Sequence, residues 1–354
     1  MKAAVFHGER DLRLEDVPEQ EIRPASVRVE VDWCGICGSD LHEYLAGPIL
    51  APAPGHPHPI SHDEVPITFG HEFAGEIVEV GDGADFNVGD RVAIEPVYRC
   101  GECAACRSGA PNLCSKLGFY GLSGGGGGLS ERAVVPDYMV HRLPDGLSFE
   151  QGALVEPMAV GLRAVRRSGI SEGQSALVFG AGPIGAVTVQ CLKAAGASMI
   201  AVAEVAEARK EKAREIGAHA VIDPAEEDVT ERIGELTGGA GADVCFDAAG
   251  IEETFQTAMA SARKGGTVVN IAIWEGDIRI HPNVMVLGEL NIHGTIAYTP
   301  QDFADTIAMI RDGKIQTEGI ITERIPLSDV VRGGFEELVA HKDRHVKILV
   351  RSSE

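Results

Sequence analysis

The sequence predicts an α/β protein in which a doubly wound parallel sheet is inserted into a partly open, barrel-like β domain. Short strands with alternating hydrophobicity fill residues 1–91, whereas strands and helices alternate from about residue 157. The last apolar strand, residues 346–350, has the pattern of the first part again. A chain of 354 residues is too long for one ordinary core and suits two domains. We therefore expect the chain to return to its first domain at the end.

The composition favours a cytoplasmic protein that binds neither nucleic acid nor a membrane. The formal net charge is −22, with acidic residues scattered along the chain, which disfavours anionic partners. The apolar runs are shorter than the ~18–20 residues of a membrane span, and the start has no signal-peptide core, so we expect no export. In a reducing compartment the eight cysteines point to metal binding or catalysis.

The first domain is predicted from strands that are bounded by Gly, Pro or Asp, such as residues 27–31 and 75–80. Residues 47–66 are rich in Pro and His and show little periodicity, so they are interpreted as a surface loop. The irregular spacing of the histidines in this loop leaves them outside the predicted site.

A thiol, a hydroxyl and an imidazole lie close together in residues 34–42, as Cys37, Ser39 and His42. Flanking glycines allow the backbone to turn tightly there. Cys37 is a candidate metal ligand, although a cysteine is often only a small buried hydrophobe. Ordinary turn hydrogen bonds are the alternative for the other two side chains. Cys34 is expected to be structural.

Two further stretches offer ligands to the same metal. His71 and Glu72 follow a short apolar run, and Glu156 lies among apolar residues where an unpaired charge would be costly. A buried salt bridge is the alternative for Glu156.

The strongest single motif is a cysteine lobe over residues 98–115. Two intervals of two residues and one of seven let four thiolates converge on one tetrahedral ion. These thiolates belong to Cys100, Cys103, Cys106 and Cys114. A closed structural zinc site is favoured over an iron–sulfur cluster or disulfides. The nearby run of five glycines, Gly124 to Gly128, predicts a loop whose role stays open.

The second domain opens with a dinucleotide-binding pattern. A strand at 175–179 leads into a glycine-rich turn, and an apolar helical pattern continues to about residue 195. The turn contains Gly180, Gly182, Pro183, Ile184 and Gly185. Such glycines allow a tight turn and close approach to a pyrophosphate, which the helix N-terminus attracts.

The next strand, residues 199–203, ends at Glu204, where a carboxylate would bond the adenosine ribose and repel a 2′-phosphate. The sequence thus favours NAD over NADP. Arg209 weakens this preference slightly, although it can equally flank the adenine.

Further strands are predicted at residues 220–222, 244–246, 267–271 and 291–296. Six strands complete a doubly wound sheet whose carboxyl ends face the ligand. The residues expected to line the nicotinamide half are Ala248, Ala272, Ile273 and Ala297. After them we expect a helix at 301–312, a stretch at 320–325 and a helix near residue 336.

On these motifs the sequence resembles the zinc-dependent medium-chain alcohol dehydrogenases, almost end to end. The residues that carry the resemblance are 37–42, 70–72, 100–114, 156–157 and 180–185. Within this family the 2,3-butanediol dehydrogenases are most similar. That likeness rests on residues 42–45, 121–124, 154–157, 269–274, 334–338 and 345–350. The polyol and threonine dehydrogenases share the metal motifs but fewer of these stretches.

The resemblance implies two Zn²⁺ per chain. Cys37, His71 and Glu156 would bind the catalytic ion, and the four cysteines of the lobe would bind the structural one. Glu72 would stand behind the catalytic ligands and approach the metal when one leaves. Ser39 and His42 would relay a proton to solvent.

The resemblance also implies a GroES-like catalytic domain at residues 1–157, a Rossmann NAD-binding domain at 158–298, and a return to the first domain at 299–354. The implied reaction is hydride transfer between a vicinal secondary diol and NAD, with 2,3-butanediol and acetoin as the favoured pair. Sorbitol- or threonine-type dehydrogenases are the alternative within the family. A dehydrogenase-derived binding protein without turnover is the alternative outside it. The family expectation is a homodimer, or a homotetramer.

Overall fold

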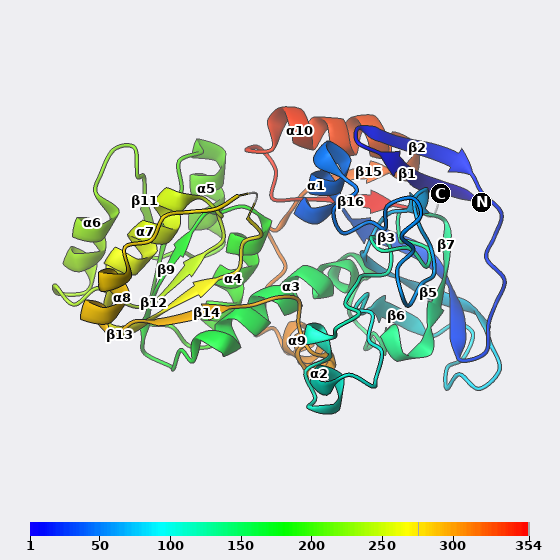
Figure 1. Cartoon of the computed structure of the whole chain (residues 1–354), viewed down its shortest axis with the longest axis horizontal. Coiled ribbons are helices and arrows are strands. Elements are labelled where there is room, and N and C mark those ends of the chain that lie inside the picture. Colours follow the sequence, from blue (N-terminus) through cyan, green and yellow to red (C-terminus); the bar gives the residue numbers. More distant parts are fainter. Residues whose placement is uncertain (275, 353–354) are drawn as a thin grey trace.

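The computed structural model describes residues 1–274 and 276–352, and helix α3 (Phe149–Ser168) joins its two halves (Figure 1). One half holds the N-terminal strands together with the C-terminal ones, and the other holds a parallel sheet flanked by helices. None of the described helices is long and apolar enough to cross a membrane.

The larger sheet of the first half contains strands from both ends of the chain. Its order is β15 (Ile321–Pro326), β16 (Lys347–Arg351), β3 (Ser26–Gly35), β5 (Glu72–Val80), β6 (Arg91–Ile94) and β8 (Val140–Arg142), and β7 (Arg132–Pro136) also pairs with β3. A small sheet has the order β2 (Asp11–Asp16), β1 (Lys2–Gly8) and β4 (Ile67–Thr68). The helices of this half are α1 (Gly38–Ala46), α2 (Ala104–Arg107), a π-helix (Val330–Glu336) and α10 (Glu337–His341), with short 3-10 helices at Pro111–Leu113, Asp137–Met139 and Leu327–Asp329. Strand β16 pairs antiparallel with β3, so the C-terminal strand lies in the same sheet as the N-terminal strands.

The second half is a six-stranded parallel sheet. Its order is β11 (Ala220–Ile222), β10 (Met199–Ala203), β9 (Ser175–Phe179), β12 (Ala242–Asp247), β13 (Ala262–Asn270) and β14 (Asn291–Gly294). The helices are α4 (Pro183–Ala194), α5 (Glu207–Glu215), α6 (Val229–Leu236), α7 (Glu252–Ser261) and α8 (Pro282–Gly288), and α9 (Pro300–Arg311) follows the sheet. Counted from β9, the strand order is that of a Rossmann fold, so the predicted fold class is confirmed.

Helix α3 is the main element that the sequence interpretation missed. It starts with a capping box in which Ser148 and Gln151 bond each other's backbone N–H, and it ends at Gly169 in a left-handed conformation. Pro157 lies inside the helix, although the sequence pattern changes at about this residue. The predicted boundary between residues 157 and 158 therefore falls within one continuous helix.

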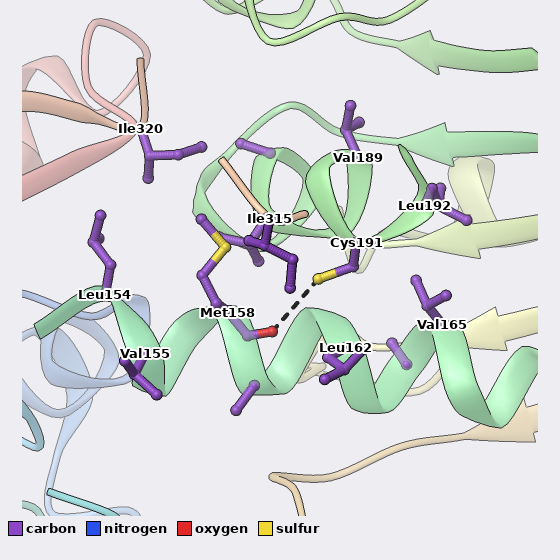
Figure 2. Packing of buried hydrophobic residues seen from close by; sticks show 14 of the residues in the cluster. Leu154, Val155, Met158, Leu162, Val165, Val189, Cys191, Leu192, Ile315 and Ile320 are labelled. Carbon is purple, nitrogen blue, oxygen red and sulfur yellow. Dashed lines mark hydrogen bonds between the residues drawn. The ribbon is translucent and has the colours of Figure 1, made fainter. Parts of the chain in front are cut away.

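The hydrophobic core around α3 is shared by both halves. Figure 2 shows side chains of α3 packed against α4 and against residues near 315–320. The labelled residues are Leu154, Val155, Met158, Leu162, Val165, Val189, Cys191, Leu192, Ile315 and Ile320. The Cys191 thiol donates to the Met158 carbonyl at 3.6 Å. Full burial of a Leu, Ile, Val or Met side chain stabilises the fold by about 1.5–3 kcal/mol. These contacts therefore fix α3 between the two halves.

Candidate active site

Strand β3 and helix α1 bring the first group of site residues into place. Cys37 is the N-cap of α1, and its backbone N–H donates to the Asp40 carboxylate at 2.9 Å. Ser39 and His42 lie three residues apart in the same helix, so both can project from one face. The Ser39 hydroxyl lies 3.3 Å from Nε2 of His71. Cys37, Ser39 and His71 are therefore neighbours, as the sequence interpretation expects.

Asp40 is a site residue that the sequence interpretation missed. Its side chain is fully buried, and Oδ1 lies 3.2 Å from Nδ1 of His71. Burial alone would lower the pKa of His71, but the charges of Asp40 and Cys37 raise it well above its usual value. A carboxylate behind one ring nitrogen leaves the other free to bind a metal. The signal was present in the sequence as an acidic residue three positions after the N-cap.

Glu72 forms a buried ion pair with Lys347, which was not among the predicted site residues. Lys347 Nζ lies 2.7 Å from both carboxylate oxygens, and it also donates to the Ile36 carbonyl at 3.1 Å. The side chains are 1% and 0% exposed. Burial lowers the pKa of Lys347, but the Glu72 charge outweighs it and holds the ammonium charged. The last strand of the chain thus supplies a charge next to Cys37.

Glu156 lies on α3 and receives a hydrogen bond from a second residue that the sequence interpretation missed. The Tyr298 hydroxyl donates to Glu156 Oε1 at 2.8 Å, and both side chains are buried. Burial raises the pKa of Glu156 to about 7. The charge of His71 lowers this pKa, and the charge of Glu72 raises it.

The donor atoms suit a zinc ion. One ligand atom each from Cys37, His71 and Glu72 lies within 4.8 Å of the others. Glu156 is outside this compact group, although the charges of His71 and Glu72 influence its carboxyl group. Thiolate, imidazole and carboxylate are the ligands that zinc prefers in proteins. Cys34 is fully buried and lies outside the groups of possible ligands among the described residues.

The cysteine lobe also has the dimensions of a zinc site. The sulfur atoms of its cysteines are 3.5 Å (Cys100 and Cys114), 3.9 Å (Cys103 and Cys114) and 4.0 Å (Cys100 and Cys106) apart. Sulfurs bound to one tetrahedral zinc at ~2.3 Å lie about 3.8 Å from one another. Backbone N–H groups, first that of Cys106, lower the pKa of Cys103 to about 5. All four thiols are free of disulfides.

The glycine run supports the strand that leads to His71. Gly128 donates its N–H to the Gly70 carbonyl at 2.7 Å. A Cβ atom at Gly127 would lie 2.2 Å from the Phe69 carbonyl oxygen, and one at Gly121 would lie 2.0 Å from the Gly70 oxygen. Only glycine allows the two backbones to pack this closely. The predicted loop therefore packs directly behind the metal-site segment.

The glycine-rich turn forms the expected strand–turn–helix. Gly180 has φ +87°, and a Cβ at Gly185 would lie only 1.9 Å from the Gly180 carbonyl oxygen. Gly182 is the N-cap of α4, with Pro183 at the first helical position and Ile184 after it. These residues leave the N-terminus of α4 suited to a pyrophosphate.

Glu204 and Arg209 lie beside this turn. The carboxylate of Glu204 accepts from Ala181 N at 2.8 Å, which ties the end of β10 to the turn. Arg209 donates to the Lys342 carbonyl at 2.5 Å, and its Nη1 would lie 3.8 Å from a Cβ at Gly182.

The predicted nicotinamide-side residues follow the ends of neighbouring strands. Ala248 comes directly after β12, and Ala272 and Ile273 follow β13. A Cβ at Gly250 would lie 2.9 Å from that of Ala272, so these two strand ends are in contact. Ala297 lies beyond β14 with φ +46° and is buried.

Comparisons with known proteins agree with this geometry. A model described as the alcohol dehydrogenase GroES-like domain matches residues 23–145, and one described as zinc-binding dehydrogenase matches residues 183–312. The (R,R)-butanediol dehydrogenase of Bacillus subtilis is 44% identical over 353 residues, which cover 99% of each chain.

Solved structures give the same result. A crystal structure of 2R,3R-butanediol dehydrogenase from Bacillus subtilis has a TM-score of 0.94 at 44% identity and 99% coverage of each chain. An Escherichia coli alcohol dehydrogenase in complex with NADH has a TM-score of 0.88 at 28% identity, again over 99% of each chain. Such similarity over nearly the whole length shows that the protein belongs to the zinc-dependent medium-chain alcohol dehydrogenases, which are oxidoreductases.

Proposed function

We propose that the protein is an NAD-dependent 2,3-butanediol dehydrogenase that interconverts (2R,3R)-butanediol and acetoin. The observation that carries this proposal is the 44% identity to an (R,R)-butanediol dehydrogenase over 99% of both chains. The position of Glu204 supports NAD, because its carboxylate follows the end of β10, where it would bond the ribose hydroxyls and repel a 2′-phosphate.

We assign Cys37, His71 and Glu156 to the catalytic zinc. Lys347 already neutralises both oxygens of Glu72, which favours a supporting role for that carboxylate. The ion would act as a Lewis acid that makes the bound hydroxyl group of the diol more acidic. The four cysteines of the lobe would hold the second, structural zinc.

The released proton leaves through α1 in this proposal. The Ser39 hydroxyl lies beside His71 and can accept a proton from the substrate hydroxyl. His42 lies one helical turn further on, is partly exposed, and can pass a proton to water.

We further propose a homodimer or homotetramer in the cytoplasm. Strand β14 is an edge of the six-stranded sheet, and the preceding helix exposes Val286 by 68% and Leu287 by 74%. An exposed strand edge beside apolar side chains favours pairing with a second copy.

A substrate panel tests the activity. Zinc-loaded protein with NAD should form NADH fastest from (2R,3R)-butanediol, compared with the other butanediol stereoisomers, sorbitol and threonine. In the reverse direction, acetoin and NADH should give a product whose new carbinol has the R configuration in chiral chromatography. Faster oxidation of sorbitol or threonine would favour the polyol-type alternative. NAD binding without any NADH formation would favour a binding protein.

A further inference from the structure

We propose that Tyr298 is a positioning residue for Glu156, and that Asn112 of the cysteine lobe holds the segment that carries Tyr298. This inference rests on the proposed function, because that proposal assigns Glu156 to the zinc. It links the structural lobe to the catalytic centre through two polar side chains.

Tyr298 fixes one oxygen of the Glu156 carboxylate. The phenol is fully buried and donates to Oε1 at 2.8 Å. Its ring packs against Phe303, with ring centroids 5.6 Å apart, so the hydroxyl is held by a rigid side chain. A carboxylate that accepts a hydrogen bond from a fixed donor loses rotational freedom, which orients its second oxygen.

The segment before Tyr298 is anchored to the cysteine lobe. The Asn112 amide donates to the Ile296 carbonyl at 3.0 Å, although 184 residues separate them. Asn112 is 2% exposed and lies two residues before Cys114. Between the two anchors, Ala297 has φ +46°, a conformation that non-glycine residues keep only when their surroundings impose it.

The segment after Tyr298 is anchored to the helix that carries Glu156. Asp302 belongs to the capping box at the start of α9, and its carboxylate accepts from Arg166 of α3 at 2.7 Å. Tyr298 is thus held by the cysteine lobe on one side and by α3 on the other. A shift of the cysteine lobe would move the Tyr298 hydroxyl, whereas Glu156 would stay in place on α3. The hydrogen bond between them would then change.

Four substitutions test both links. Tyr298→Phe removes the hydroxyl and keeps the ring, and Asn112→Leu removes the amide. Tyr120→Phe is a matched control, since this buried phenol donates to the Val134 carbonyl at 3.2 Å. Gln190→Met is the control for the amide, because Gln190 donates to the Ile216 carbonyl at 2.9 Å inside the nucleotide-binding half.

We expect Tyr298→Phe to lower kcat for butanediol about tenfold or more, the scale of one hydrogen bond to a charged group. It should also speed the release of one of the two zinc ions to a chelator while the affinity for NADH is retained. Asn112→Leu should lower kcat by a smaller factor. The double variant should match Tyr298→Phe, because Asn112 acts through it. Both controls should keep the wild-type kcat and zinc-release rate.

Two results would overturn the inference. One is a kcat and zinc-release rate for Tyr298→Phe equal to those of the wild type. The other is a double variant whose loss equals the product of the two single losses, since independent sites multiply. A wild-type protein that binds NADH but oxidises no diol would instead refute the proposed function. The zinc-release rates then decide the positioning role without turnover.

Discussion

Replacing Lys347 by Met should destabilise the protein strongly, because it leaves the Glu72 carboxylate buried without its counter-charge. The ion pair has a separation of 2.7 Å, and its side chains are 1% and 0% exposed. At an effective dielectric constant of about 20 the attraction at this distance is about 6 kcal/mol. Desolvation of both ions offsets much of it, yet removal of one partner of a buried pair typically costs ~3–5 kcal/mol. At ~2–4 °C per kcal/mol, the melting temperature should fall by roughly 6–20 °C.

Thermal melts followed by circular dichroism measure this effect in zinc-free and zinc-loaded protein. The zinc-loaded variant should lose less, because the cation supplies a positive charge near Glu72. A second substitution, Glu72→Gln, in the Lys347→Met background should recover much of the loss, since no buried charge then remains. Lys2→Met is the surface control, because the side chains of Lys2 and its partner Asp16 are 48% and 76% exposed, and its loss should be small. A Lys347→Met variant with the melting temperature of the wild type would refute the reasoning. A double variant that melts no higher than Lys347→Met would also refute it.

Three further outcomes are expected. Cys37→Ala and Cys103→Ser should each lose about one zinc per chain by elemental analysis, but only Cys103→Ser should also lower the melting temperature markedly, because its ion closes the lobe. Glu204→Ser should raise kcat/KM for NADP relative to NAD, and an unchanged ratio would place the ribose contact elsewhere. Gly127→Ala should lower the melting temperature because its Cβ would lie 2.2 Å from a backbone oxygen, whereas Gly234→Ala in open helical space should not.

The sequence was most informative where a pattern is local. Strands β9, β10 and β11 have the predicted bounds, because each is a short apolar run that ends at turn or polar residues. The four cysteines of the lobe span only 15 residues, from Cys100 to Cys114, so spacing alone predicts that they converge. The predicted strand at 291–296 was too long, since β14 ends at Gly294 and the chain turns towards Ala297.

The sequence was least informative where two distant groups meet. The pairs Glu72–Lys347 and Glu156–Tyr298 are separated by 275 and 142 residues, and no local pattern marks either partner. Helix α3 was missed for a different reason. Pro157 normally interrupts a helix, and here packing on both sides outweighs that preference. The capping box at Ser148 was the local signal that could have revealed it.

Because β16 comes late in the sequence, the two metal sites are completed at different times during synthesis. The cysteine lobe can form once it has left the ribosome, because all its ligands lie within one short segment. The catalytic centre is completed later, because Lys347 follows Cys114 by 233 residues. Until that strand pairs with β3, Glu72 lacks its buried counter-charge. The cysteine lobe can therefore bind its zinc during synthesis before Glu72 acquires its buried counter-charge.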